Sequence, residues 1–256
     1  MENLEHELWI VQAINAAFGP IVTAFLRAIG RPVPDPAHVI PNYLAVILLI
    51  IVALTALSLL VRSRLSVDKP GKLQIIMEDG LAGLNGMLDE WVGPTGRKYL
   101  PLVGTIGLFI LVCNLSGLVP GLMAPTSNVN VTLGCAISVW VFYHIEGVRA
   151  QGLVKYLKHF AVPPGSPVVL APLMLVIETI SHMARVMSLT LRLFGNIYAE
   201  ELVILILASL VPFFVPLPMM ALGLLTSSLQ AFIFVMLTMS YLGGAVATDH
   251  ADEAHH

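Results

Sequence analysis

Ionisable side chains lie within residues 168–214, a stretch that is otherwise apolar enough for a membrane. A charged group at bilayer depth costs roughly 2.5–3.5 kcal/mol on insertion scales, so such groups normally face a water-filled cavity or a charged partner. Glutamate and histidine can pass protons on, because burial or a neighbouring charge moves their pKa toward neutrality, whereas arginine stays charged. One obligate cation among titratable groups therefore favours a proton path. The groups are Glu178, His182, Arg185, Arg192, Glu200 and Glu201.

The spacing of these groups predicts a polar stripe along one helix. At about 100° per residue, five polar groups fall within about 80° of Arg192, whereas Glu201 falls on the opposite face. Arg185 and His182 can also be explained as side chains that snorkel to the headgroups, and Glu178 as a structural partner of Arg185. Arg192 is the hardest to explain in that way, because apolar residues flank it. The five groups of the stripe are Glu178, His182, Arg185, Asn196 and Glu200.

A second polar face is expected on the last apolar segment of the chain. At about 100° per residue, Ser227, Thr238 and Tyr241 all fall within about 80° of Gln230. Hydrogen bonds between neighbouring helices account for such a face as well as a water-lined path does, so both interpretations stay open.

Membrane-spanning helices are the elements that must position these groups. The chain of 256 residues is 57% hydrophobic and 11% charged, whereas soluble domains are about 25% charged. Several apolar runs reach the roughly 20 residues that a helix needs to cross a bilayer. The sequence therefore indicates an all-α polytopic membrane protein. Spans are expected at residues 43–61, 100–119 and 131–143, and a nearly continuous apolar region follows over 168–246, broken around 212–218.

The first part of that apolar region is too long for one upright helix. Residues 168–214 would extend about 70 Å as a helix, against a hydrocarbon core of about 30 Å. They form either two spans or one very oblique helix, and the periodicity does not choose. Around the spans we expect an interfacial segment at 8–29, an amphipathic surface helix at 73–91 and a polar loop at 146–167. The chain then divides into an N-terminal interfacial segment (1–42), a single transmembrane domain (43–246) and a polar tail (247–256).

The basic residues of the loops predict an orientation. Residues 62–98 hold six Lys and Arg residues and residues 146–167 hold three, whereas residues 120–130 hold none. The positive-inside rule therefore places the first two segments in the cytoplasm and the N-terminus outside. The polar tail contains no Lys or Arg, so the rule does not place it.

Composition and motifs also exclude several classes of protein. A net charge of −3 with no basic cluster argues against a nucleic-acid partner. The chain lacks the GxxxxGK[ST], HExxH and GxSxG motifs and a GxGxxG motif after a strand, so we expect neither a catalytic site nor a cofactor. Cys113 and Cys135 stand in apolar runs without metal-ligand spacing, which favours buried or lipid-facing thiols over a disulfide or metal site. Residues 1–8 are acidic, unlike a cleavable signal peptide.

Three sequence blocks resemble the signatures of one family, subunit a of F-type ATP synthases. The most specific block surrounds the intramembrane arginine, and the three blocks keep the family's order, so that the resemblance covers about residues 40–245. The blocks are SLTLRLFGNIYAEEL at 188–202, LQAFIFVMLT at 229–238, and NLSGLVPG at 114–121 with PTSNVNVT at 125–132.

The resemblance implies a stator with two offset aqueous half-channels beside a rotating c-subunit ring. Arg192 matches the family's essential arginine, which faces the ring and prevents a short circuit between the half-channels, and Glu201 matches an acidic position on the proton-entry side. Asn196 and Gln230 match polar positions near the arginine. The remaining matches are Ser188 and Arg185 toward the cytoplasmic exit, and Asn114, Asn128 and Asn130 along the outer access path.

The resemblance also implies a fold, partners and a location. We expect about five transmembrane helices plus amphipathic surface helices, the last two spans forming a long oblique hairpin beside the c-ring. The expected partners are the c-ring, the peripheral stalk b subunits, the lipid bilayer and the remainder of the ATP synthase complex. The expected location is the bacterial inner membrane, with the C-terminus in the cytoplasm, and the chemistry on ATP belongs to other subunits.

The sequence departs from the family pattern at two positions. Val186 stands where many members carry proline, which puts a helix kink there in doubt. Gly223 stands seven residues before Gln230, where some members carry a histidine or acid, so Glu200 beside Glu201 is a candidate for the second titratable group.

Three alternatives remain beside a proton-conducting stator. The same stator can use Na+ as its coupling ion. A secondary transporter would bind an anionic substrate at Arg192 and predicts internal repeats, which we do not see. A structural anchor would use its polar groups only to join helices and predicts that Arg192 can be replaced without loss.

Overall fold

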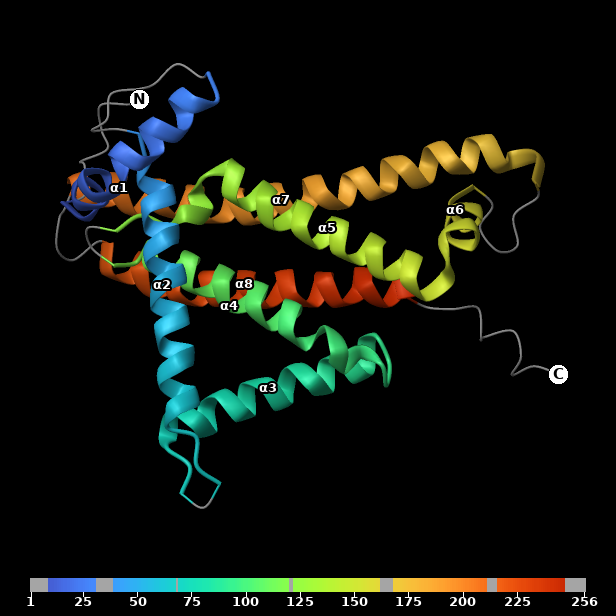
Figure 1. The fold of residues 1–256 in the computed structure, drawn as a ribbon, viewed down its shortest axis with the longest axis horizontal. Helices are drawn as coiled ribbons and strands as arrows, with labels where there is room; N and C mark the ends of the chain where they lie inside the picture. The colour runs from blue at the N-terminus through green and yellow to red at the C-terminus, as the bar shows by residue number, and fades with distance from the viewer. Residues whose placement is uncertain are drawn as a thin grey trace.

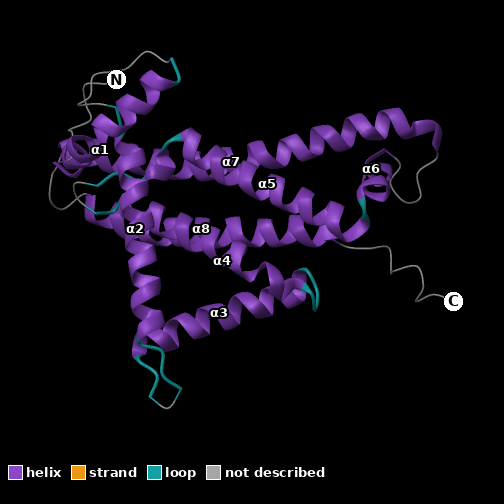
Figure 2. Cartoon of the chain, in the orientation of Figure 1, coloured by secondary structure: helices purple, strands orange, loops and turns teal. Residues whose placement is uncertain are grey.

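The computed structural model describes residues 9–30, 39–67, 69–119, 122–161, 168–210 and 216–246. All regular structure within these ranges is helical, which confirms the all-α fold class (Figure 2). The predicted polar tail and residues 1–8 lie outside the described residues. The helices are α1 (Trp9–Ala28), α2 (Asn42–Ser63), α3 (Lys72–Trp91), α4 (Leu100–Ser116), α5 (Val129–Gln151), α6 (Leu153–Ala161), α7 (Ala171–Leu210) and α8 (Pro216–Val246), with 3-10 turns η3 (Gly96–Tyr99), η4 (Pro125–Ser127) and η5 (Val168–Leu170).

Five helices in the described ranges are long and apolar enough to cross a membrane, as the sequence predicts. The surface helix expected at residues 73–91 is also present, as α3. The spans are Asn42–Ser63, Gly96–Ser116, Val129–Gln151, Ala171–Leu210 and Pro216–Val246.

The third span is much longer than the predicted range of 131–143. Helix α5 continues to Gln151 and takes in the first residues of the expected polar loop. Glu146, the first residue of the expected loop, is buried and accepts a hydrogen bond from Arg149 one turn later, at 2.6 Å. The helix ends only at Gly152, whose φ of +81° favours glycine. Most of the rest of the expected loop is helical as well, as α6.

One continuous helix, α7, occupies most of the region that the periodicity left open. It has 40 residues, about 60 Å in length, which is twice the thickness of the hydrocarbon core. In Figure 1, α7 and α8 run lengthwise together and cross α2 at a steep angle. With α2 across the bilayer, the two long helices are therefore strongly oblique. Position 186 holds valine where many members of the family carry proline, which agrees with the unbroken helix.

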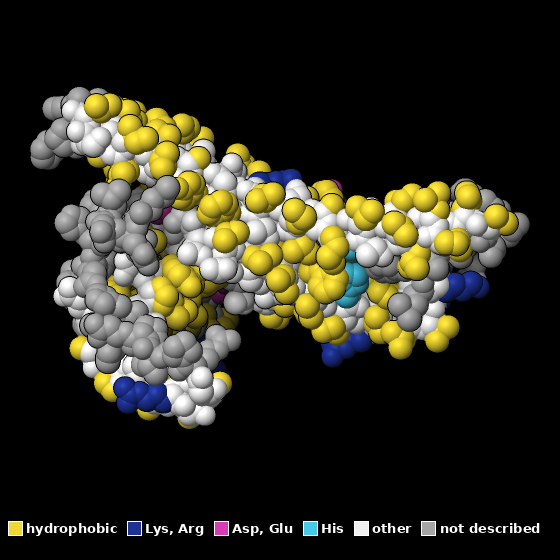
Figure 3. Space-filling model, turned by 90° about the horizontal axis from the view of Figure 1, so that it is seen from above, with side chains coloured by type: hydrophobic (Ala, Val, Ile, Leu, Met, Phe, Trp, Pro, Cys, Tyr) yellow, Lys and Arg dark blue, Asp and Glu magenta, His cyan; other side chains and the backbone are white. Residues whose placement is uncertain are grey.

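Helices α4, α5, α7 and α8 pack around the main apolar core, which holds Ile110, Val139, Leu193 and Phe234. Helix α2 packs against α4 at one end of this bundle, around Cys113. Cys113 is buried and Cys135 is half-buried, both as free thiols, as expected. Figure 3 shows hydrophobic side chains over much of the described surface on one face, with only scattered Lys and Arg side chains, which suits contact with lipid.

Candidate functional site

The polar stripe of α7 lies along the border between the exposed and the buried face of this helix. Leu189, Leu193 and Ile197 are buried in the bundle, whereas Arg192 is exposed. The Arg192 guanidinium donates a long hydrogen bond of 3.4 Å to the exposed Ser188 hydroxyl one turn before it. Among the described residues no carboxylate forms an ion pair with Arg192. This cation near the middle of α7 therefore points outward from the bundle.

Two polar side chains join α7 to α8 one turn beyond the arginine. The Asn196 amide nitrogen donates to the Gln230 amide oxygen at 2.8 Å. Gln230 is only 3% exposed, and the other polar residues of its face, Ser227 and Thr238, are also buried. These contacts identify the predicted polar face of α8 as the face that packs into the bundle.

A groove of about 370 Å³ continues from these residues between α7 and α8. The Glu200 carboxylate lies in it and accepts a hydrogen bond of 2.7 Å from the Thr226 hydroxyl. A Cβ atom added at Gly223 would collide with the Glu200 carboxylate and would lie 2.9 Å from Leu118 Cδ2. The Glu200 carboxylate therefore fills the space that a side chain at position 223 would need.

The neighbouring Glu201 carboxylate points to a different part of the fold. Its Oε1 accepts a hydrogen bond of 2.6 Å from the backbone N–H of Ala124, at the start of η4. Gly117, directly after α4, lies close by, since a Cβ added there would be 3.1 Å from the same oxygen. The two consecutive carboxylates thus diverge, as their helical positions predict, one toward α8 and the other toward α4 and η4.

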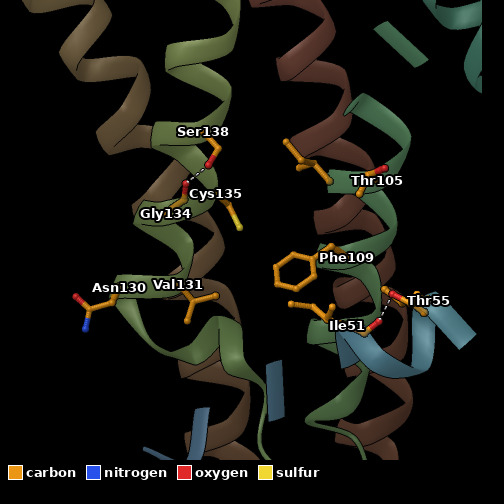
Figure 4. A pocket seen from close by; sticks show the side chains of 11 residues that line it. Ile51, Thr55, Thr105, Phe109, Asn130, Val131, Gly134, Cys135 and Ser138 are labelled. Carbon is orange, nitrogen blue, oxygen red and sulfur yellow. Dashed lines mark hydrogen bonds between the residues drawn. The ribbon is translucent and has the colours of Figure 1, made fainter. Parts of the chain in front are cut away.

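The asparagines assigned to an outer access path lie in two places. Asn114 is 2% exposed and is enclosed by α4, η4 and α8. Asn128 caps α5, because its side-chain oxygen accepts the backbone N–H of Asn130 at 3.0 Å. Asn130 is exposed and borders a groove of about 510 Å³ between α2, α4 and α5. In Figure 4 its amide points away from the other labelled side chains of this groove.

This second groove has mainly apolar walls despite its hydroxyl groups. The hydroxyls of Thr55, Thr105 and Ser138 donate to carbonyl groups of their own helices at 2.5–2.8 Å. Such bonds turn the polar atoms toward the helix backbone, as the dashed lines in Figure 4 show for Thr55 and Ser138. The groove therefore offers little that could hold an ion.

The polar groups before Arg192 form a third cluster, packed against α5. His182 is 6% exposed, with Nε2 at 3.2 Å from the Glu178 carboxylate and Nδ1 at 2.6 Å from the Tyr143 hydroxyl. Arg185 lies over the Tyr241 ring, at 5.2 Å from its centroid. Glu178 therefore pairs with His182 rather than with Arg185, and His182 is held inside the bundle rather than at the headgroups.

Sequence reasoning missed Tyr143 and His144 on α5, which contact His182, and Tyr156 on α6, which contacts His144. The His144 ring lies 4.8 Å from the His182 ring between centroids, and its Nδ1 is 2.6 Å from the Tyr156 hydroxyl. Burial raises the pKa of Tyr156 to about 12, so the phenol stays protonated at neutral pH. Tyr143 and His144 are adjacent in the sequence, at the end of the predicted range 131–143. This pair was a signal that could have identified the cluster.

Titratable groups thus lie at both ends of a segment of α7 that has the arginine at its centre. His182 is about 15 Å from Arg192 along the axis, and Glu201 is about 13 Å away in the other direction. The two ends contact different elements, α5 and α6 at one end and α4, η4 and α8 at the other. The arrangement can hold protons at two separate places with a fixed cation between them.

Comparisons with known proteins point to one family. The family model described as ATP synthase A chain matches residues 43–243. The protein "ATP synthase subunit a" of Geotalea daltonii is 48% identical over 202 residues, which are 79% of this chain and 86% of that protein. "ATP synthase subunit a" of Solibacter usitatus is 47% identical over 209 residues, 82% of this chain and 88% of that protein. "ATP synthase subunit a" of Koribacter versatilis is 39% identical over 247 residues, 96% of this chain and all of that protein.

Proposed function

The chain belongs to the ATP synthase A chain family, and from that premise we propose that it carries protons to and from a ring of c subunits as the membrane stator of an F-type ATP synthase. The five candidate spans and the bacterial relatives make it a bacterial membrane protein. Its inner-membrane location, outside N-terminus and cytoplasmic C-terminus are part of the proposal. So are its partners, namely the c-ring, the peripheral stalk b subunits, the lipid bilayer and the rest of the complex.

The observation that carries this proposal is the outward-facing Arg192. A guanidinium on an apolar helix surface at bilayer depth needs an anionic partner or water, and the described residues supply no carboxylate. A ring carboxylate that passes this position would be kept ionised by the neighbouring cation. Because arginine keeps its own proton, it can displace a proton from the ring without passing it across.

The clusters on either side of Arg192 are the proposed half-channels. The entry side contains Glu200, Glu201, Asn196 and Gln230, and Asn114, Asn128 and Asn130 shape its outer part. The exit side contains Glu178, His182, Arg185 and Ser188. A proton would have to travel on the ring between the two sides, because the arginine stands between them.

The exit cluster favours protons over Na+ as the coupling ion. Its central group is an imidazole between a carboxylate and a phenol, which can accept a proton on one side and release one on the other. Each proton that crosses 100 mV delivers about 2.3 kcal/mol, so several protons must be combined for each ATP that the other subunits make.

Separate replacement of the two glutamates tests the proposed entry half-channel. In proteoliposomes of the complete complex, we expect Glu201→Gln to slow ATP-driven proton pumping by about a hundredfold or more, because a positioned proton-transfer group contributes roughly 10²–10⁴-fold. Glu200→Gln should also lower the rate, whereas Glu90→Gln on the exposed face of α3 should not. Full activity of both the Glu200 and the Glu201 variants would contradict the proposed path.

A further inference from the structure

A buried hydrogen-bond network connects α4, η4 and α8 beside Glu201. The Thr126 hydroxyl donates to Asn114 Oδ1 at 2.7 Å, and Asn114 Nδ2 donates to the Ser227 carbonyl oxygen at 3.3 Å. Thr126 is 0% exposed and Asn114 is 2% exposed. Because a buried polar group left without a partner destabilises the fold, these bonds hold η4 in one position against the two helices.

The segment around Ala124 is fixed on both sides. Before it, the Ser116 hydroxyl lies 3.2 Å from the Met123 carbonyl oxygen. After it, Thr126 is bonded to Asn114. Between these anchors the Ala124 backbone N–H points at Glu201 Oε1, at 2.6 Å. The position of this N–H group therefore depends on side chains that do not themselves touch the carboxylate.

The charge of Glu201 decides how strongly this N–H group binds it. A hydrogen bond to an ionised carboxylate is roughly twice as strong as one to a neutral group. A proton that arrives on Glu201 would weaken the bond to Ala124 and free the side chain to turn away from η4. The turn can thus act as a dock that holds the carboxylate between proton transfers.

We propose that Thr126 is a positioning residue for proton transfer, which fixes η4 so that the Ala124 N–H docks ionised Glu201 and releases it when protonated. This inference rests on the proposed function of Glu201 in the entry half-channel. Among the described residues the charged group beside Glu201 is Glu200, and the Ser127 hydroxyl is a second polar neighbour from η4. The adjoining residue after α4 is Gly117, which carries no charge.

Thr126→Val tests the dock with little change in shape. We would measure ATP synthesis by proteoliposomes of the complete complex at constant electrical potential, while varying the pH on the entry side. Because the ionised form of Glu201 would lose stabilisation, the pH of the half-maximal rate should move upward. The expected shift is about one pH unit, because this is the change in pKa when about half of the free energy of a charge-assisted hydrogen bond is lost.

Two variants serve as controls. Thr126→Ser keeps the hydroxyl and should restore the normal pH profile. Thr55 is exposed on α2, and its hydroxyl donates to the Ile51 carbonyl oxygen of the same helix. Thr55→Val removes this hydroxyl and should leave the pH profile unchanged. If Thr126→Val does not assemble, Ser116→Ala replaces it, because it removes the other anchor of this segment, the hydroxyl 3.2 Å from the Met123 carbonyl oxygen, without touching Glu201.

The outcomes separate this inference from the proposed function. The dock is supported if the pH of the half-maximal rate rises in Thr126→Val and stays at its normal value in Thr126→Ser. An unshifted profile, or a rate lowered equally at every pH, overturns it even where Glu201→Gln is inactive. Full activity of Glu201→Gln would instead overturn the proposed role of Glu201 in the entry half-channel, on which the dock depends.

Discussion

Gly223→Ala should create a steric conflict whose main partner is the Glu200 carboxylate. The new Cβ would collide with Glu200 Oε1 and would also lie 2.9 Å from Leu118 Cδ2. Glu200 would have to move and give up its 2.7 Å hydrogen bond with Thr226. Overpacking of this kind costs about 1–3 kcal/mol, which lowers a midpoint temperature by about 2–12 °C for a chain of this size.

The assay is the temperature at which ATP-driven proton pumping by the assembled complex is half-inactivated. Glu200→Ala removes the carboxylate, so Gly223→Ala should cost much less in that background. Contacting residues are expected to show such non-additive behaviour. A normal midpoint for Gly223→Ala, or an equal penalty with and without the carboxylate, would refute the claim that Glu200 occupies this space.

Two further predictions concern the exit cluster and the surface of α3. Tyr143→Phe removes the hydroxyl 2.6 Å from His182 Nδ1 and keeps the ring. We expect several-fold slower proton pumping. An unchanged pumping rate would exclude a relay role for the phenol. The Arg97 guanidinium, 2.7 Å from Asp89, lowers the pKa of that carboxyl. Because the pKa of Asp89 is lowered in the folded state, the pair stabilises the protein at pH values above the ordinary pKa of aspartate. This stabilisation is lost as the pH falls through the lowered pKa. Asp89→Asn should therefore lower the midpoint slightly at neutral pH, and the difference from the parent should vanish in acid and in high salt.

The helices that carry function could be predicted because their signals are local. Apolar length identified the spans, and helical periodicity placed Glu200 and Glu201 on different faces before any partner was known. The length of α7 could not be decided in this way, since one oblique helix and two spans have the same apolar pattern. The predicted third span was too short for a related reason. Hydropathy does not show the ion pair between Glu146 and Arg149, which lies within the continued helix.

The partners of the functional side chains could not be predicted, because they come from distant parts of the chain. Ala124 reaches Glu201 across 77 residues, and Tyr143 reaches His182 across 39. Gly223 was recognised as a departure from the family pattern, but only the packing of α7 against α8 reveals that Glu200 fills its space. The residue types and their helix faces could therefore be predicted from the sequence, whereas tertiary packing determines which of these groups meet.

The most direct test of the central claim is ATP-driven acidification of membrane vesicles that contain the complete complex, with Arg192→Ala compared with the parent. Arg62→Ala, an exposed arginine at the end of α2, is the matched control. We expect Arg192→Ala to abolish acidification while the complex stays assembled and the Arg62→Ala control pumps normally. Retained acidification in Arg192→Ala would contradict the central claim, because the outward cation would then not control the ring carboxylates.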